Sequence, residues 1–136
     1  MDVKRLIQGH EGYSLKPYKC TSGKITIGWG RNLDDRGISE SEAMLLFEND
    51  LADVLQNCRK YPWFDSLSEV RKAAVMDLMF NLGPNRFAGF RNFIQAMSLQ
   101  QYTWAAAELK DSRWYTQVGR RGPRIASMIR NDTWPT

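Results

Sequence analysis

The chain has few of the residues that hold metal ions or form disulfide frameworks. Its 136 residues include two cysteines, Cys20 and Cys58, and a single histidine, His10. Because these ligands form no closely spaced cluster, the sequence argues against a metal site, and we expect no cofactor. Cys58 falls on the apolar stripe of a predicted helix, which favours a buried free thiol. A disulfide would form only if the fold brought the two cysteines together.

Long apolar runs are also missing. No stretch approaches the length that a bilayer-spanning segment needs, and the first twelve residues, MDVKRLIQGHEG, lack the apolar core of a signal peptide. We therefore expect synthesis in the cytoplasm without an export signal. Internal repeats, low-complexity tracts and flexible linkers are absent as well, which favours a single domain over residues 1–136.

The charge balance is moderately positive. With 19 lysines and arginines against 15 aspartates and glutamates, the formal net charge is +4. This charge favours polyanionic surroundings, and nucleic acid, anionic lipid and acidic cell-wall polymers all qualify. No basic–aromatic recognition motif supports a nucleic-acid partner. The late arginines indicate either a solvated basic face or contact with an anionic substrate; they are Arg113, Arg120, Arg121, Arg124 and Arg130.

The first part of the chain predicts a short helix and then a β-hairpin. Apolar residues recur at helical spacing after Asp2, a good N-cap, so we expect a helix over residues 3–11 that ends at Gly12. The next segments, SLKPYK and KITIGWG, flank CTSG, which predicts a hairpin with a Ser-Gly turn. Thr26 should face the side of its strand opposite to the two neighbouring isoleucines.

The rest of the chain is predicted to be helical. Ser39 and Glu42 form a capping-box pattern that opens a long helix over residues 39–59. Further helices are expected from Ser66, with Glu69, to Leu82, around residues 90–97, around residues 104–109, and from Pro123 onward. The fold class is therefore α+β and mostly helical, with its only sheet near the N-terminus.

Three side chains between Gly9 and Gly30 can surround one small cleft: Glu11, Cys20 and Thr26. Glu11 lies where the helix dipole and partial burial disfavour its charged form, and a protonated carboxyl is the general acid that glycosidic cleavage needs. A solvated helix-terminal glutamate is the plainer interpretation. Thr26 could hold the water that an inverting hydrolase requires, although a strand threonine is often only a good β-former.

Cys20 leaves several roles open. An aspartate here would be ionised at pH 7, whereas an ordinary thiol, with a pKa of about 8.5, is mostly neutral. Either the thiol has a lowered pKa, or it attacks as a nucleophile, or it is only a weak polar neighbour. A plain turn cysteine and an engineered substitution are further interpretations. Inversion or retention at the sugar stays open, because it depends on the separation of Cys20 from Glu11.

This spacing, and the order of later motifs, resembles the phage-type lysozymes, the family of the T-even phage enzyme. The resemblance covers almost the whole chain and rests on KITIGWGRNL (a glycine-bearing strand), GISESEAMLLFENDL (an interlobe helix), AAVMDLMFNLG and AGFRNF (helices beside the cleft) and SRWYTQVGRRGPRIASMIRNDTW (a C-terminal signature). The best-known members carry aspartate at the position of Cys20, and some members carry cysteine.

The resemblance implies a lysozyme-like fold built from two lobes. The N-terminal lobe would span about residues 12–38 and the interlobe helix about residues 39–59. The C-terminal lobe would span about residues 60–136, with the helix 1–11 packed on it.

The resemblance also implies roles for particular residues. Glu11 matches the general acid, Thr26 the water-orienting threonine, and Arg121 the arginine that pairs with the acid. That ion pair would favour the charged carboxylate and so oppose the helix dipole. Positions that match the substrate-binding cleft are Phe80, Asn32, Phe93 and Glu108, the last three of which differ from the best-known member.

The function implied by the resemblance is that of an endolysin. Such a lysozyme hydrolyses the β-1,4 bond between N-acetylmuramic acid and N-acetylglucosamine in peptidoglycan and lyses the bacterial host. We expect a monomer that stays in the host cytoplasm until a separate membrane pore, a holin, gives it access to the wall in the periplasm. A lytic transglycosylase, which forms an anhydro product, and a non-catalytic wall-binding protein on the same fold are the alternatives.

Overall fold

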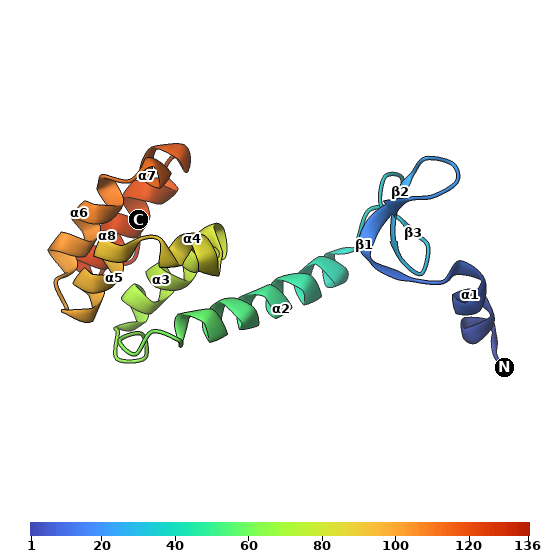
Figure 1. The fold of residues 1–136 in the computed structure, drawn as a ribbon, viewed down its shortest axis with the longest axis horizontal. Coiled ribbons are helices and arrows are strands. Elements are labelled where there is room, and N and C mark those ends of the chain that lie inside the picture. Colours follow the sequence, from blue (N-terminus) through green and yellow to red (C-terminus); the bar gives the residue numbers. More distant parts are fainter. The chain divides into compact units, whose positions relative to one another are not determined.

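The computed structural model describes residues 1–136 and shows an α+β chain that is mostly helical, as predicted (Figure 1). It comprises eight helices and one three-stranded sheet. The chain divides into two compact units, Met1–Phe47 (unit 1) and Glu48–Thr136 (unit 2). None of the helices has the length and apolar character needed to cross a membrane.

Unit 1 begins with helix α1, Val3–Glu11, which has the predicted bounds. A carboxylate oxygen of Asp2 accepts a hydrogen bond of 2.8 Å from the backbone N–H of Arg5, which satisfies one of the donors left free at a helix start. Gly12 ends the helix with φ of +62°, a conformation that glycine adopts without steric cost. Both predicted caps are confirmed.

The sheet follows α1 directly. It is antiparallel in the order β1 (Ser14–Lys19), β2 (Ile25–Gly28) and β3 (Arg31–Asn32). The predicted hairpin is β1–β2. The sequence did not indicate β3, because a two-residue strand is too short to show an alternating pattern.

Helix α2, Glu40–Cys58, starts with the predicted capping box. The backbone N–H of Ser39 donates to Glu42 Oε1 at 2.8 Å, and the backbone N–H of Glu42 donates to Ser39 Oγ at 3.2 Å. Arg31 of β3 binds the same carboxylate, with 2.7 Å between a guanidinium nitrogen and Oε2. The Glu42 carboxylate therefore links the start of α2 to Arg31 of the sheet.

Unit 2 is entirely helical. Its helices after α2 are α3 (Glu69–Leu82), α4 (Pro84–Ala88), α5 (Arg91–Ser98), α6 (Tyr102–Lys110), α7 (Arg113–Gln117) and α8 (Arg121–Asn131). The predicted helices near residues 90–97 and 104–109 correspond to α5 and α6. The sequence did not indicate α4 and α7, which are single short turns without a full period of apolar residues.

Two predicted helix starts in unit 2 are wrong. Ser68, not Ser66, caps α3: its Oγ accepts from the backbone N–H of Arg71 at 3.2 Å, whereas Ser66 Oγ donates to the Trp63 carbonyl. Helix α8 begins two residues before Pro123. Proline is accommodated there because N–H groups of the first helical turn have no partner within the helix.

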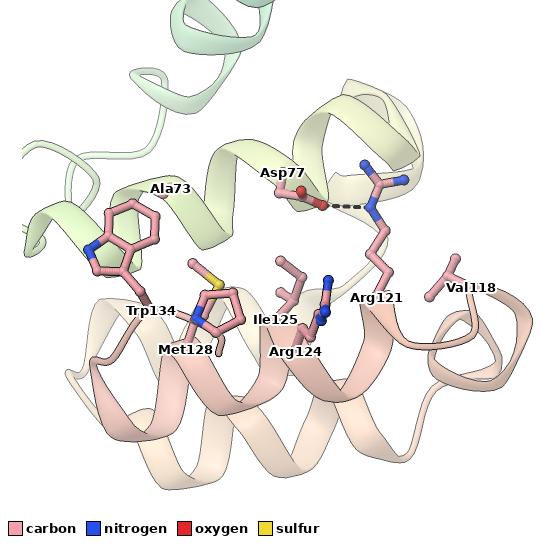
Figure 2. A pocket seen from close by; sticks show the side chains of 9 residues that line it. Ala73, Asp77, Val118, Arg121, Arg124, Ile125, Met128 and Trp134 are labelled. Carbon is pink, nitrogen blue, oxygen red and sulfur yellow. Dashed lines mark hydrogen bonds and ion pairs between the residues drawn. The ribbon is translucent and has the colours of Figure 1, made fainter.

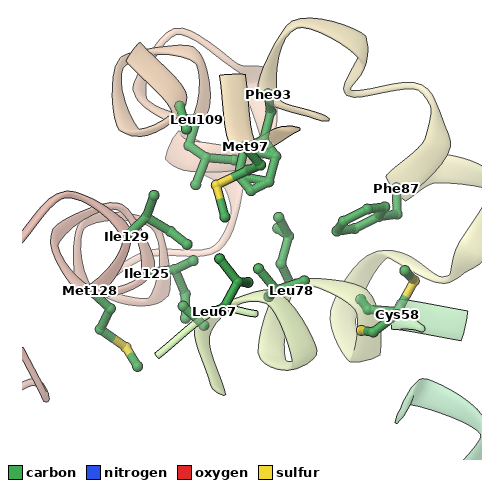
Figure 3. Packing of buried hydrophobic residues seen from close by; sticks show 14 of the residues in the cluster. Cys58, Leu67, Leu78, Phe87, Phe93, Met97, Leu109, Ile125, Met128 and Ile129 are labelled. Carbon is green, nitrogen blue, oxygen red and sulfur yellow. The ribbon is translucent and has the colours of Figure 1, made fainter. Parts of the chain in front are cut away.

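The hydrophobic core belongs to unit 2. Every buried hydrophobic side chain lies between residues 54 and 129, and Figure 3 shows Leu78, Phe93 and Ile129 among those that meet at its centre. Cys58 is completely buried in this core and unpaired, and burial raises the pKa of its thiol to about 12. The prediction of a buried free thiol is confirmed.

Arg71 fastens α3 to the end of α8. Its Nε donates to the Ile129 carbonyl at 2.7 Å, and a terminal nitrogen donates to the Arg130 carbonyl at 3.2 Å. Its guanidinium also lies 3.7 Å from the centroid of the Tyr102 ring, a cation–π geometry. These contacts hold α3 and α8 side by side. The two helices also carry most of the polar residues of the pocket that contains Asp77 and Arg121.

Candidate functional site

Glu11 is the last residue of α1, and its carboxylate lies against Gly30 in the turn between β2 and β3. A Cβ added to Gly30 would be 2.6 Å from Oε2 and 2.9 Å from Cδ of Glu11. Gly30 has φ of +78°, so the residue combines a backbone conformation and a close approach that both favour glycine. The Glu11 side chain is exposed. Its carboxylate therefore reaches the turn between β2 and β3 at the end of α1.

Thr26 lies in β2 between Tyr18 of β1 and Asn32 of β3. Only 4% of its surface is exposed, whereas its neighbour Ile25 is 40% exposed. The predicted alternation of faces is present, with the polar residue on the covered side. Thr26 Oγ1 donates its proton to the Lys24 carbonyl at 3.0 Å. The oxygen of this hydroxyl is thus left to act as an acceptor.

Cys20 stands at the start of the turn that joins β1 to β2. Its carbonyl accepts from the backbone N–H of Gly23 at 2.8 Å, and its own N–H donates to the Lys24 carbonyl at 2.9 Å. Gly23 has φ of +81°, as expected for a hairpin loop that closes through a left-handed glycine. The predicted Ser-Gly turn is therefore present, and it presents the Cys20 side chain at one end of the sheet.

The Cys20 thiol is surrounded by hydrogen-bond donors. Its Sγ lies 3.1 Å from Ser22 Oγ. This contact, followed by hydrogen bonds with the backbone of Lys24 and of Ser22, lowers the pKa of the thiol to about 7. Thr26 makes a smaller contribution in the same direction. About half of the thiol would therefore be ionised at neutral pH, which favours the first of the roles left open for Cys20.

Sequence reasoning missed two residues that shape this end of unit 1. Ser22 was considered only as part of a turn, although a serine two residues from a candidate thiol can reach it within a tight turn. Gly30 in its strand predicts only a bend or the close approach of some other group. That this group is the Glu11 carboxylate depends on tertiary contact, for which the sequence holds no local signal.

Asn32 belongs to the same sheet but is already engaged. Its Nδ2 donates to Asp35 Oδ2, and its Oδ1 accepts from the backbone N–H of Asp35, both at 3.0 Å. These bonds hold the turn that follows β3. One N–H of Nδ2 and one lone pair of Oδ1 remain for a sugar, and substrate binding by Asn32 stays a prediction.

Phe93 and Glu108 lie together in unit 2. Both line a pocket of about 430 Å³ formed by α5, α6 and the segments beside them. The ring of Phe93 is only 1% exposed and packs edge-on against Phe87 at 6.1 Å between centroids. Glu108 is half-buried, and its Oε1 accepts from the indole N–H of Trp104 at 3.1 Å. Of the two, Glu108 is the one that offers polar atoms to a ligand.

Arg121 lines a second pocket of unit 2, with a volume of about 550 Å³. Figure 2 shows it pointing toward Asp77 of α3, and its Nε donates to Asp77 Oδ1 at 2.6 Å. Arg124 and Trp134 line the same pocket. On α3, one turn from Asp77, Phe80 is 41% exposed.

The remaining charged groups do not form a metal site. No three His, Cys, Asp or Glu side chains of the chain come together in the geometry of a metal centre. Four of the five late arginines, Arg113, Arg120, Arg124 and Arg130, are exposed. They give unit 2 a basic surface, which is consistent both with a solvated basic face and with contact with an anionic substrate.

Comparisons with known proteins agree with the motifs. The family model described as phage lysozyme matches residues 8–130. The chain is 27% identical to a probable T4-type lysozyme 1 of Dictyostelium discoideum, over 96% of this chain and 95% of that protein. It is 29% identical to an endolysin of Acyrthosiphon pisum secondary endosymbiont phage 1, over 87% and 82% of the two chains. It is also 25% identical to the pre-baseplate central spike protein Gp5 of Enterobacteria phage T4, but there it covers 28% of the larger protein.

Proposed function

The chain belongs to the phage lysozyme family, and on that premise we propose that it hydrolyses the β-1,4 bond between N-acetylmuramic acid and N-acetylglucosamine in peptidoglycan. The family match and the names of its relatives indicate a lysozyme-like glycoside hydrolase of the endolysin kind. Such an enzyme would lyse the bacterial host.

The observation that carries the proposal is the position of the Glu11 carboxylate. It lies against Gly30, in the turn that directly follows the strand bearing Thr26. Glu11 would donate its proton to the leaving glycosidic oxygen as the bond to the sugar carbon breaks. The exposed Glu11 carboxyl at the end of α1 has room for such a leaving group.

Thr26 and Cys20 would act on the other side of the reaction. Thr26 Oγ1, whose proton is donated to the Lys24 carbonyl, can accept a hydrogen bond from the attacking water. Cys20, with its lowered pKa, can supply a negative charge that orients this water or stabilises positive charge at the sugar.

Arg121 enters the proposal as a residue whose part in catalysis the resemblance implies. Its guanidinium has further donors besides the Nε that binds Asp77. Arg121→Gln tests this role, since turnover of peptidoglycan equal to that of the wild type would contradict it. The cleft residues Phe80, Asn32, Phe93 and Glu108 stay predictions of substrate contact.

The decisive experiment is the digestion of purified peptidoglycan by the wild-type protein and by Glu11→Gln. We expect muropeptides whose mass includes one added water and a loss of at least 100-fold in the variant, since general acid catalysis contributes about 10²–10⁴-fold. Glu48→Gln, an exposed carboxylate of α2, is the matched control and should keep full activity. Anhydro products would identify a lytic transglycosylase instead. Tight pelleting with peptidoglycan and no released products would identify a wall-binding protein.

Access to the wall is tested separately. We propose that the enzyme waits in the host cytoplasm, as a monomer, until a holin opens the membrane. Expression of the chain alone in a bacterium should then leave cells intact, and chloroform treatment should cause immediate clearing. Clearing without chloroform would contradict the need for a separate pore.

A further inference from the structure

The Ser22 hydroxyl is the side-chain partner of the Cys20 sulfur. The two atoms are 3.1 Å apart, inside a turn closed by the Gly23 N–H to the Cys20 carbonyl and by the Cys20 N–H to the Lys24 carbonyl. These backbone bonds leave the loop little freedom to separate Ser22 from Cys20. The backbone of the turn therefore keeps Ser22 within reach of the Cys20 sulfur.

We propose that Ser22 is a positioning residue, whose hydroxyl holds the Cys20 sulfur in place and in its ionised form for the reaction. This inference rests on the proposed function, since it concerns the work of Cys20 in glycoside hydrolysis. Ser22 itself does not touch the reacting atoms. It acts through Cys20.

The chemistry of the pair sets the direction of the hydrogen bond. A thiolate can only accept, so in the ionised state the Ser22 hydroxyl must be the donor. A hydrogen bond to the charged form stabilises that form. The backbone groups of Lys24 and Ser22 assist, and together these contacts account for the pKa of about 7 at Cys20.

Charged side chains do not explain the ionisation of Cys20. The flanking lysines, Lys19 and Lys24, are not among the causes that lower its pKa through their side chains, and Lys24 Nζ is paired with Asp35 at 3.2 Å. Thr26 contributes least to the lowered pKa of Cys20, and its hydroxyl donates to the Lys24 carbonyl. Ser22 is thus the side chain whose removal should change the thiol most.

The test compares three variants of the turn. Ser22→Ala removes the hydroxyl, Ser22→Thr keeps it, and Thr21→Ala alters the neighbouring exposed residue as a matched control. The rate at which iodoacetamide alkylates Cys20 is measured against pH by mass spectrometry of the Cys20 peptide. Cys58 reacts little because it is completely buried, and Cys20→Ala gives the background.

The wild type, Ser22→Thr and Thr21→Ala should reach half-maximal alkylation near pH 7. In Ser22→Ala this midpoint should rise by about one pH unit, toward the value of an ordinary thiol. On peptidoglycan, Ser22→Ala should lower kcat about tenfold with KM unchanged, and threonine should restore it.

An unchanged alkylation midpoint in Ser22→Ala would overturn the proposal, and so would a raised midpoint with an unchanged kcat. Absence of turnover in the wild type refutes the proposed function, whatever the alkylation experiment shows. The two failures are therefore distinguishable.

Discussion

Replacing Gly30 by alanine should reduce activity far more than it reduces stability. The new methyl carbon would be 2.6 Å from Oε2 and 2.9 Å from Cδ of Glu11, well inside van der Waals contact. The obstructing atoms are the far end of a flexible side chain. Glu11 can therefore yield by rotating its carboxyl away from Gly30, which relieves the clash but misplaces the proposed general acid.

The size of the effect follows from the geometry. To reach ordinary contact at 3.4 Å, the carboxylate oxygen must retreat from 2.6 Å, a displacement of about 0.8 Å. A misplacement of about 1 Å at a catalytic group can cost on the order of 100-fold in rate. We therefore expect kcat to fall by about 30- to 100-fold.

The stability cost has a different origin. Gly30 has φ of +78°, and alanine in the left-handed region costs about 1–2 kcal/mol. Gly28→Ala is the matched control: Gly28 has φ of +66°, but nothing lies within 4 Å of an added Cβ. Both variants should lose a similar amount of stability, and Gly28→Ala should keep most of its activity.

The assay measures the release of soluble muropeptides from purified peptidoglycan together with thermal unfolding by circular dichroism. Equal losses of activity in both variants would show that backbone strain, not displacement of Glu11, is responsible. Full activity in Gly30→Ala would refute the catalytic placement of the carboxylate against this turn.

Three further predictions concern other sites. Cys20→Ala should lower activity more than tenfold while Cys20→Asp largely preserves it, and full activity of the alanine variant would make Cys20 a bystander. Arg31 and the backbone N–H of Ser39 hold the pKa of Glu42 at about 2, below its ordinary value of 4.5. The stability that the Glu42 ion pair contributes is thus complete above pH 4.5 and is lost as the pH falls toward 2. Glu42→Gln should therefore flatten the dependence of Tm on pH in this range. Parallel curves for the variant and the wild type would contradict the lowered pKa of Glu42. Phe93→Ala should destabilise the protein by about 3–5 kcal/mol in denaturant unfolding, because the ring fills the core, and a small loss would show that it serves the pocket instead.

Much of the fold could be predicted because its signals are local. Asp2 and Gly12 bound α1, and Ser39 with Glu42 opens α2, since each cap needs only backbone donors a few residues away. The wrong prediction of Ser66 as the cap of α3 also came from a local signal. Two serines lay within one turn of the helix start, and only the observed backbone path selects Ser68.

Local signals in the sequence predicted only part of the candidate site. The identities of Glu11, Cys20 and Thr26 came from their spacing and from the resemblance to a family. The lowered pKa of Cys20 came from donors that the closed turn brings to its sulfur, which composition does not reveal. Likewise, the sequence does not distinguish a phenylalanine such as Phe93 that lines a cleft from one that fills a core.

The sequence alone determined α1, the β1–β2 hairpin with its turn, the start of α2 and the family, because these depend on residues close together in the chain and on the order of motifs. Tertiary structure decided that the Glu11 carboxylate rests on Gly30, that Arg121 binds Asp77, and that Phe93 is enclosed. Contacts of this kind join residues that are distant in sequence. Their free energies depend on how folded elements pack, and local propensities carry no information about that packing.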